Sequence, residues 1–81
     1  GPELREVFVT ADAAAAGHQI VDMEIPQGVI VVLVRRGDLT FMPQGRTVVL
    51  AGDELLIAAE PAQRAAVDAL FVAPARRGGA G

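Results

Sequence analysis

Few residues in this chain could take part in catalysis or metal binding. Its 81 residues include one histidine, His18, and three threonines, and they contain no Cys, Ser, Lys, Asn, Tyr or Trp. Nucleophilic catalysis mostly uses Ser, Cys or Lys beside a general base, so the residue types argue against an enzyme. A zinc site needs several His or Cys ligands, and a lone histidine does not supply them within one chain. The sequence therefore predicts a module without catalytic or metal chemistry.

The charged residues argue against a nucleic-acid-binding surface. The formal net charge is -3, and all seven basic residues are arginine. A nucleic-acid-binding domain normally presents a basic face. The longest apolar run, Val29 to Val34, ends at the pair Arg35 and Arg36. This run is far shorter than the roughly 20 residues of a membrane-spanning helix, so it is interpreted as a strand.

The chain length predicts one small domain, which we place at residues 4–72. The hydrophobic fraction is 52% with only 4% aromatic residues, so the core consists of aliphatic side chains that suit a sheet. Gly1-Pro2 is typical of a protease-cleavage scar, and residues 1–3 are predicted to be a leader. Residues 73–81, Gly-rich from Pro74, are predicted to be a disordered tail. A domain this small buries little apolar surface, so self-association is expected.

Residue patterns predict several strands. A β-rich run covers Glu6 to Thr10, and the strongest strand signal is Val29 to Arg36, which is apolar without alternation. Such continuity predicts burial on both faces, or coverage by a partner. The dipeptide Gly37-Asp38 predicts a hairpin turn after this strand. The remaining predicted strands are Leu39–Met42, Thr47–Leu50 and Glu54–Ala59.

Two helices are predicted, one before and one after the central strands. The first covers about Gly17 to Glu24 and ends before Pro26, which restricts the residue that precedes it. The second begins near Pro61, a favoured first-turn residue, and carries Val67 and Phe71 at helical spacing. The resulting order, β-α-β-β-β-(β)-α with a mostly antiparallel sheet, predicts a small α+β domain.

Five short segments follow one another at compatible spacing. They are Ala16 to Ile20 (AGHQI), the turn Ile25 to Gly28 (IPQG), the strand end Arg35 to Asp38 (RRGD), Met42 to Gly45 (MPQG) and Leu50 to Ile57 (LAGDELLI). In this order they resemble the RCK_C, or TrkA-C, domain family, over about Leu4 to Phe71. One departure is His18, where the family often has Lys or Arg.

The resemblance implies a non-catalytic regulatory domain of a bacterial potassium transport protein or cation/proton antiporter. The segments at Arg35 and at Leu50 to Ile57 are most similar to domains attached to antiporters. Such a domain is expected in the cytoplasm, tethered to the inner membrane through the parent transporter. RCK_C domains are similar in forming homodimers through their sheets. Several bind cyclic di-AMP in the groove of the dimer, and no permanent cofactor is expected.

The same resemblance implies a set of ligand-contacting residues. Adenine would need apolar walls, and phosphate would need donors such as arginine. A two-fold symmetric dinucleotide suits a two-fold axis, because each copy supplies the same contacts. For each implied residue an alternative without a ligand stays open: the aliphatic side chains could belong to the core of the sheet, and the arginines could be charges exposed to solvent. The implied residues are Ile30 and Val31 with Val32 as a competitor, Arg35 or Arg36 as donors, and Met42 and Pro43 as a rim.

Two further functions stay open at this stage. The chain could be a purely structural dimerisation module that couples two transporter subunits without a ligand. It could also be the sensing domain of a transcriptional repressor. The chain has no Asn, whereas family members often carry one near the position of Met42, so a ligand other than cyclic di-AMP also stays open.

Overall fold

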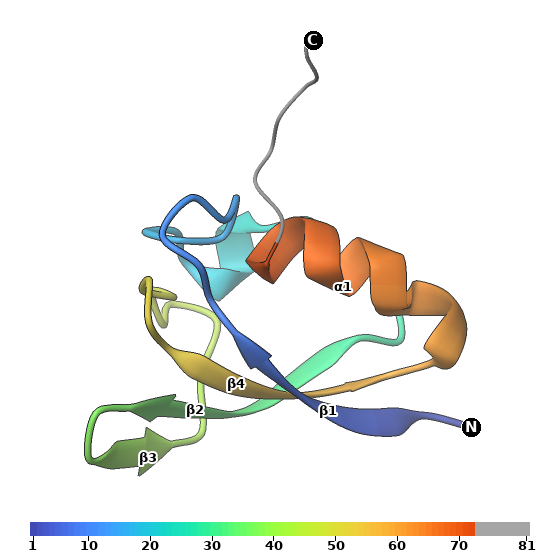
Figure 1. The fold of residues 1–81 in the computed structure, drawn as a ribbon, viewed down its shortest axis with the longest axis horizontal. Coiled ribbons are helices and arrows are strands. Elements are labelled where there is room, and N and C mark those ends of the chain that lie inside the picture. The colour runs from blue at the N-terminus through green and yellow to red at the C-terminus, as the bar shows by residue number, and fades with distance from the viewer. Residues whose placement is uncertain (73–81) are drawn as a thin grey trace, which may run out of the picture.

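The computed structural model describes residues 1–72, in which a four-stranded sheet carries a helix on one face (Figure 1). The strands are β1 (Glu3–Phe8), β2 (Ile30–Arg36), β3 (Leu39–Phe41) and β4 (Glu54–Ala59). Their order in the sheet is β1-β4-β2-β3, and every neighbouring pair is antiparallel. The predicted α+β class with a mostly antiparallel sheet is confirmed.

The strand β2 has partner strands on both sides and so lies inside the sheet. It pairs with β4 on one side and with β3 on the other. The predicted hairpin turn is confirmed, because Arg36 pairs with Leu39 and Gly37 has a φ of 58°, a backbone conformation that glycine adopts readily. The register between β2 and β4 shifts between Val31 and Leu33, so Val32 lies at a bulge.

One face of the sheet, which we call the inner face, is covered by the helix α1 (Arg64–Phe71). Val34, Leu55 and Ile57 are at most 1% exposed there, and α1 contributes Val67 and Phe71 to the same cluster. A 3-10 turn, η2 (Pro61–Gln63), precedes the helix and closes with a capping box between Glu60 and Gln63. The buried apolar cluster consists of Val7, Val9, Ala13, Ala15, Val29, Val34, Val49, Leu55, Ile57, Ala59, Val67 and Phe71.

The predicted helix from Gly17 to Glu24 and the predicted strand from Thr47 to Leu50 are both wrong. The first segment contains only a 3-10 turn, η1 (Ile20–Asp22), and the second joins no strand of the sheet. The reason is that the two segments bond to each other. Gln19 and Val48 form an isolated antiparallel bridge, and the Ile20 N–H donates to the Thr47 carbonyl at 3.0 Å.

The ends of the described chain can be compared with the predicted domain boundaries at residues 4 and 72. Glu3 belongs to β1 and pairs with Ala59, so the sheet starts one residue before the predicted domain. The predicted tail, residues 73–81, lies outside the described residues.

Candidate functional site

An open groove of about 480 Å³ lies beside the start of β2. Two loops flank the strand there: the segment around η1, and the connection from β3 to β4, residues 42–53, which we call the β3–β4 loop. Most of the side chains are aliphatic, so the groove suits a flat apolar group more than a compact ion. The lining residues are Ile20, Val21, Met23, Ile25, Val29, Ile30, Val31, Pro43, Gln44 and Gly45.

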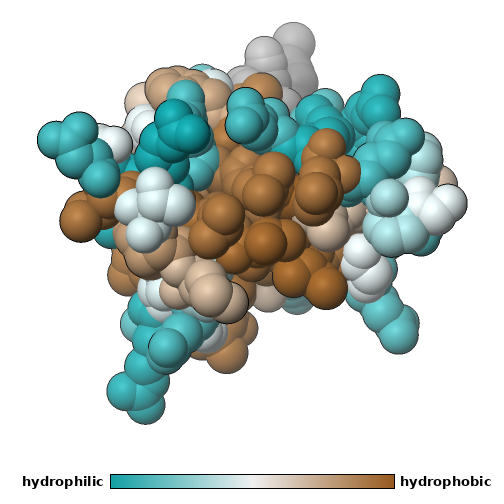
Figure 2. All heavy atoms as spheres, turned by 90° about the horizontal axis from the view of Figure 1, so that it is seen from below, coloured by the Kyte–Doolittle hydropathy of each residue, from teal (hydrophilic) through white to brown (hydrophobic). Residues whose placement is uncertain are grey.

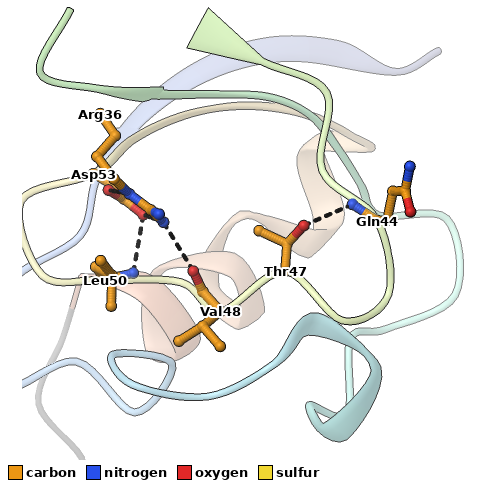
Figure 3. Close-up of polar contacts among 6 residues, drawn as sticks. All are labelled: Arg36, Gln44, Thr47, Val48, Leu50 and Asp53. Carbon is orange, nitrogen blue, oxygen red and sulfur yellow. Dashed lines mark hydrogen bonds and ion pairs between the residues drawn. The ribbon is translucent and has the colours of Figure 1, made fainter. Parts of the chain in front are cut away.

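Backbone hydrogen bonds join the two loops that line the groove. The Val21 N–H donates to the Gly45 carbonyl at 2.7 Å, next to the bond between Ile20 and Thr47. Within the β3–β4 loop, the Gln44 N–H donates to Thr47 Oγ1 at 2.9 Å (Figure 3). The two loops are therefore joined through their backbones, and we expect a displacement of the β3–β4 loop to affect both.

The structure brings three of the residues implied by the resemblance together. Ile30, Val31 and Pro43 all line the groove, and Ile30 is 62% exposed although it lies in a strand paired with β4. Val32 is partly buried at the bulge. Met42 precedes Pro43 and is 75% exposed, outside the groove lining. An apolar wall and a neighbouring exposed thioether are thus available to a ligand.

Arg35 lies apart from this groove. It follows Ile30 by five residues, which at about 3.3 Å per residue is roughly 16 Å along the strand. Its guanidinium is exposed, with Nη1 lying 3.4 Å from Glu54 Oε1. Thr40 and Leu33 line a small hollow with these two side chains. Exposed ion pairs contribute little free energy, so the guanidinium can exchange Glu54 for another anion at low cost.

Arg36 has the opposite environment. Its Nε donates to Asp53 Oδ1 at 2.9 Å and its Nη2 to Asp53 Oδ2 at 2.8 Å. The same Nη2 also donates to the Val48 carbonyl at 2.8 Å (Figure 3). The guanidinium carbon lies 5.3 Å from the ring centroid of Phe41, within the range of a cation–π contact. Arg36 is therefore already engaged by groups of its own chain.

Asp53 is a buried carboxylate, 1% exposed. Burial alone would raise its pKa, but the hydrogen bonds from Arg36, the 2.9 Å bond from the Leu50 N–H and the charge of Arg36 outweigh it. The pKa of Asp53 therefore lies below its ordinary value. The hydrogen bond and charge of Asp53 raise the pKa of Arg36, against a smaller effect of burial. Both groups are charged at neutral pH.

One partner of Asp53 is local in the sequence and the other is distant. A carboxylate in a turn commonly accepts a nearby backbone N–H, as Asp53 does from Leu50. The partner Arg36 is 17 residues away, and no local pattern indicates the contact. Within residues 1–72, no group of three or more His, Cys, Asp and Glu is placed to hold a metal ion.

The outer face of the sheet, opposite α1, carries a hydrophobic surface, of which the sequence indicated only the part that lies on β2. Cross-strand pairing sets Leu4, Ala58 and Ile30 in one row. Leu56 and Leu33 follow in the next row, and Phe8 in the third. We call these six residues the outer-face patch. Leu4 is 66% and Phe8 56% exposed, and Figure 2 shows a continuous hydrophobic area bordered by hydrophilic side chains.

Fold and site together describe a small α+β domain with an apolar groove beside an open sheet face. A family model of the TrkA-C domain matches residues 4–72. The chain therefore belongs to the TrkA-C domain family, which identifies it as a regulatory domain in ion transport. Of the helices within residues 1–72, none has the length and hydropathy needed to cross a bilayer.

Solved structures support the same fold. Fourteen chains match, and one of them is the structure of an RCK domain with cda. It has a TM-score of 0.72 at 19% sequence identity, covering 83% of this chain and 96% of that chain. At this identity the likeness concerns the fold, and it confirms the RCK_C-like architecture. A search of curated proteins finds no match.

Proposed function

We propose that this chain is the cytoplasmic regulatory domain of a bacterial potassium transport protein or cation/proton antiporter, tethered to the inner membrane through that transporter. In this proposal the domain acts as a homodimer that senses cyclic di-AMP. The observation that carries it is the position of Ile30, which belongs both to the outer-face patch and to the apolar groove. A second copy on the patch would therefore adjoin the groove.

A second copy is the occupant that the outer-face patch suits best. Contiguous exposed apolar patches mark interaction surfaces, and this one changes character along β2. The row at Ile30 is apolar, whereas the row at Arg35 contains Glu54 and Thr40 beside Phe8. If the β2 strands of two copies run in opposite directions across a two-fold axis, the charged end of one faces the apolar end of the other. Like charges then stay apart.

The same arrangement supplies the two kinds of contact that a cyclic dinucleotide needs. Ile30 and Val31 would form the wall for an adenine, with Met42 and Pro43 as its rim and Val32 as a competing wall residue. Arg35 would reach a phosphate from the other copy, exchanging its exposed partner Glu54. An RCK domain of the same fold has been solved with cda, which supports a role in ligand binding.

Regulation requires that the ligand favour one arrangement of the dimer. A ligand shifts a conformational equilibrium only as far as its affinities for the two states differ. A ligand that contacts both copies depends on their relative position, so its binding couples to that position. The transporter subunits attached to the two copies would then respond together.

Calorimetric titration with cyclic di-AMP tests the proposal. We expect one ligand per two chains, and Arg35→Ala should raise the Kd roughly tenfold to a hundredfold, as expected from loss of a charge-assisted hydrogen bond. The matched control is Arg64→Ala, because Arg64 is also an exposed arginine, paired with Glu3 on the helix side. This control should bind as the unchanged chain does.

A folded dimer that gives no response to cyclic di-AMP, related dinucleotides or ATP would overturn the sensing function. The outer-face patch by itself favours the remaining candidate, a purely structural dimerisation module, because it needs no ligand. In that case Arg35→Ala leaves transport regulation unchanged. The sensing domain of a repressor would require a helix-turn-helix segment in the same protein.

A further inference from the structure

The guanidinium of Arg36 contacts the β3–β4 loop at both ends. Phe41, whose ring it faces at 5.3 Å, is the last residue of β3. Asp53, which accepts two of its hydrogen bonds, directly precedes β4. Between them, Val48 accepts a third bond through its carbonyl. One side chain at the end of β2 therefore contacts the residue before the loop and bonds to the loop where it folds back and where it leaves. Figure 3 shows Arg36 with its partners Val48 and Asp53.

The β3–β4 loop needs such contacts because it lies outside the sheet. Its most β-prone segment, residues 47–50, joins no strand of the sheet and bonds instead to residues 17–20, through the bridge between Val48 and Gln19 and through backbone hydrogen bonds of Thr47 and Val49. Asp53 is itself held, since its side chain accepts the Leu50 N–H and its carbonyl accepts the Val9 N–H at 2.9 Å. The Arg36–Asp53 pair thus connects to the strand β2 a loop whose backbone otherwise bonds to Val9 and to residues 17–21.

This loop carries one side of the ligand groove. Pro43, Gln44 and Gly45 line it, and the bond between Gly45 and Val21 continues into the opposite wall. Arg36 itself is absent from the lining. A change at Arg36 therefore reaches the groove through the backbone of the loop.

We propose that Arg36 is a positioning residue that holds the β3–β4 loop, through Asp53, Val48 and Phe41, in the conformation that binds ligand. The proposal rests on the function proposed above and assigns different roles to the two neighbouring arginines. Arg35 contacts the phosphate, and Arg36 shapes the groove. Lysine cannot replace Arg36, because a single ammonium does not bond to both carboxylate oxygens, the carbonyl and the ring at once.

Two substitutions separate positioning from direct ligand contact. Arg36→Lys keeps the charge and loses the bidentate geometry, whereas Asp53→Asn keeps Arg36 and weakens its attachment. Positioning predicts that both raise the Kd for cyclic di-AMP about tenfold, within the range of couplings inside one hydrogen-bond network. Direct contact predicts that Asp53→Asn leaves binding unchanged or strengthens it, because Arg36 is released. Unchanged or tighter binding by Asp53→Asn overturns the proposal.

Stability must be separated from affinity in this experiment. Calorimetry is therefore done at a temperature where each variant is folded. The fitted stoichiometry then reports the fraction of protein that can bind, and the Kd refers to folded protein only. A purely structural role lowers the melting temperature and leaves this Kd unchanged, which also overturns the proposal. The matched control is Arg64→Lys, which alters another ion-paired arginine and should change neither quantity.

Hydrogen exchange on the ligand-free protein gives an independent readout. Both variants should raise amide exchange at Gln44, Thr47 and Leu50 by at least about tenfold, while Ile57 in β4 keeps its protection. Unchanged exchange in the loop contradicts the positioning role. If the unchanged chain does not bind cyclic di-AMP, the proposed function and the predicted change in affinity both fail. Raised exchange in the variants would still support the conclusion that Arg36 holds the loop.

Discussion

At the scale of single residues, the Arg36–Asp53 pair shows how this small domain accommodates a buried charge. Removing a carboxylate from water is costly unless hydrogen bonds replace its hydration. Asp53 receives three such bonds, two from Arg36 and one from the Leu50 N–H. Two of the three come from a permanently charged donor, which makes them stronger than neutral ones. The pair therefore contributes to stability as well as fixing the loop.

The lowered pKa of Asp53 makes the stability of the domain sensitive to acid. A carboxyl whose pKa is lower in the folded state contributes stability above its unfolded value, about 3.9, and loses it as the pH falls through the folded pKa. The raised pKa of Arg36 matters only near its own alkaline range. We expect the free energy of unfolding, measured with urea, to decrease below about pH 4.

Asp53→Asn should remove this component of the acid sensitivity. At pH 7 the variant should lose about 2 kcal/mol, as expected when a charged hydrogen-bond partner is removed from a half-exposed arginine. Its stability should then fall less steeply between pH 5 and 2 than that of the unchanged chain. Glu24→Gln, at an exposed carboxylate, is the control and should follow the unchanged chain. A variant with the same acid dependence as the unchanged chain would contradict the assignment to Asp53.

At the scale of elements, the turn before β2 joins the groove to the helix. Gly28 has a φ of 90°, and a Cβ built there would lie 3.3 Å from Gln63 Oε1. Gln63 takes part in the capping box and donates through Nε2 to the Gln27 carbonyl. The loop that enters β2 is therefore attached to the start of the final helical segment.

Two glycines with nearly equal φ allow this attachment to be tested. Gly17 has a φ of 87° with nothing near its Cβ position, so Gly17→Ala should cost only the backbone strain, about 1 to 2 kcal/mol. Gly28→Ala should cost more, because the added methyl also displaces Gln63. Urea unfolding of both variants measures the difference. Equal losses would show that the contact with Gln63 has no energetic weight.

The elements also show where sequence patterns are sufficient to predict secondary structure. The strand β4 occupies the predicted range, Glu54–Ala59, and β2 begins one residue later than predicted, because their patterns reflect burial along one continuous strand. The segments 17–24 and 47–50 were mispredicted because they bond to each other across about 30 residues, and no local pattern encodes such a pairing.

The candidate site was predictable to a similar extent. Ile30, Val31 and Pro43, three of the ligand contacts that the resemblance implies, line one groove. The resemblance could not separate Arg35 from Arg36, because alternation along β2 turns neighbouring side chains to opposite faces. One arginine lies at an exposed ion pair and the other on a buried carboxylate. This difference depends on the tertiary position of Asp53.

At the scale of the whole molecule, the sheet has one covered and one open face. The inner face packs against α1 and holds the core, whereas the outer face presents the outer-face patch to solvent (Figures 1 and 2). The apolar run in β2 was predicted to be buried on both faces or covered by a partner. Within residues 1–72, Val34 on the inner side is buried and Ile30 on the outer side is exposed, which favours a partner.

The substitution Ile30→Glu tests whether a second copy is that partner. Ile30 is mostly exposed in the single chain, so the change should leave the fold intact, whereas in a dimer it would bury an unpaired carboxylate against an apolar surface. Light scattering should therefore report a dimer for the unchanged chain and a folded monomer for the variant. Ala65→Glu adds the same charge to an exposed position on α1 and should remain dimeric. A monomeric unchanged chain, or a variant that stays dimeric, would exclude the outer-face patch as the interface, because two copies that meet on this patch would bury the new carboxylate at position 30.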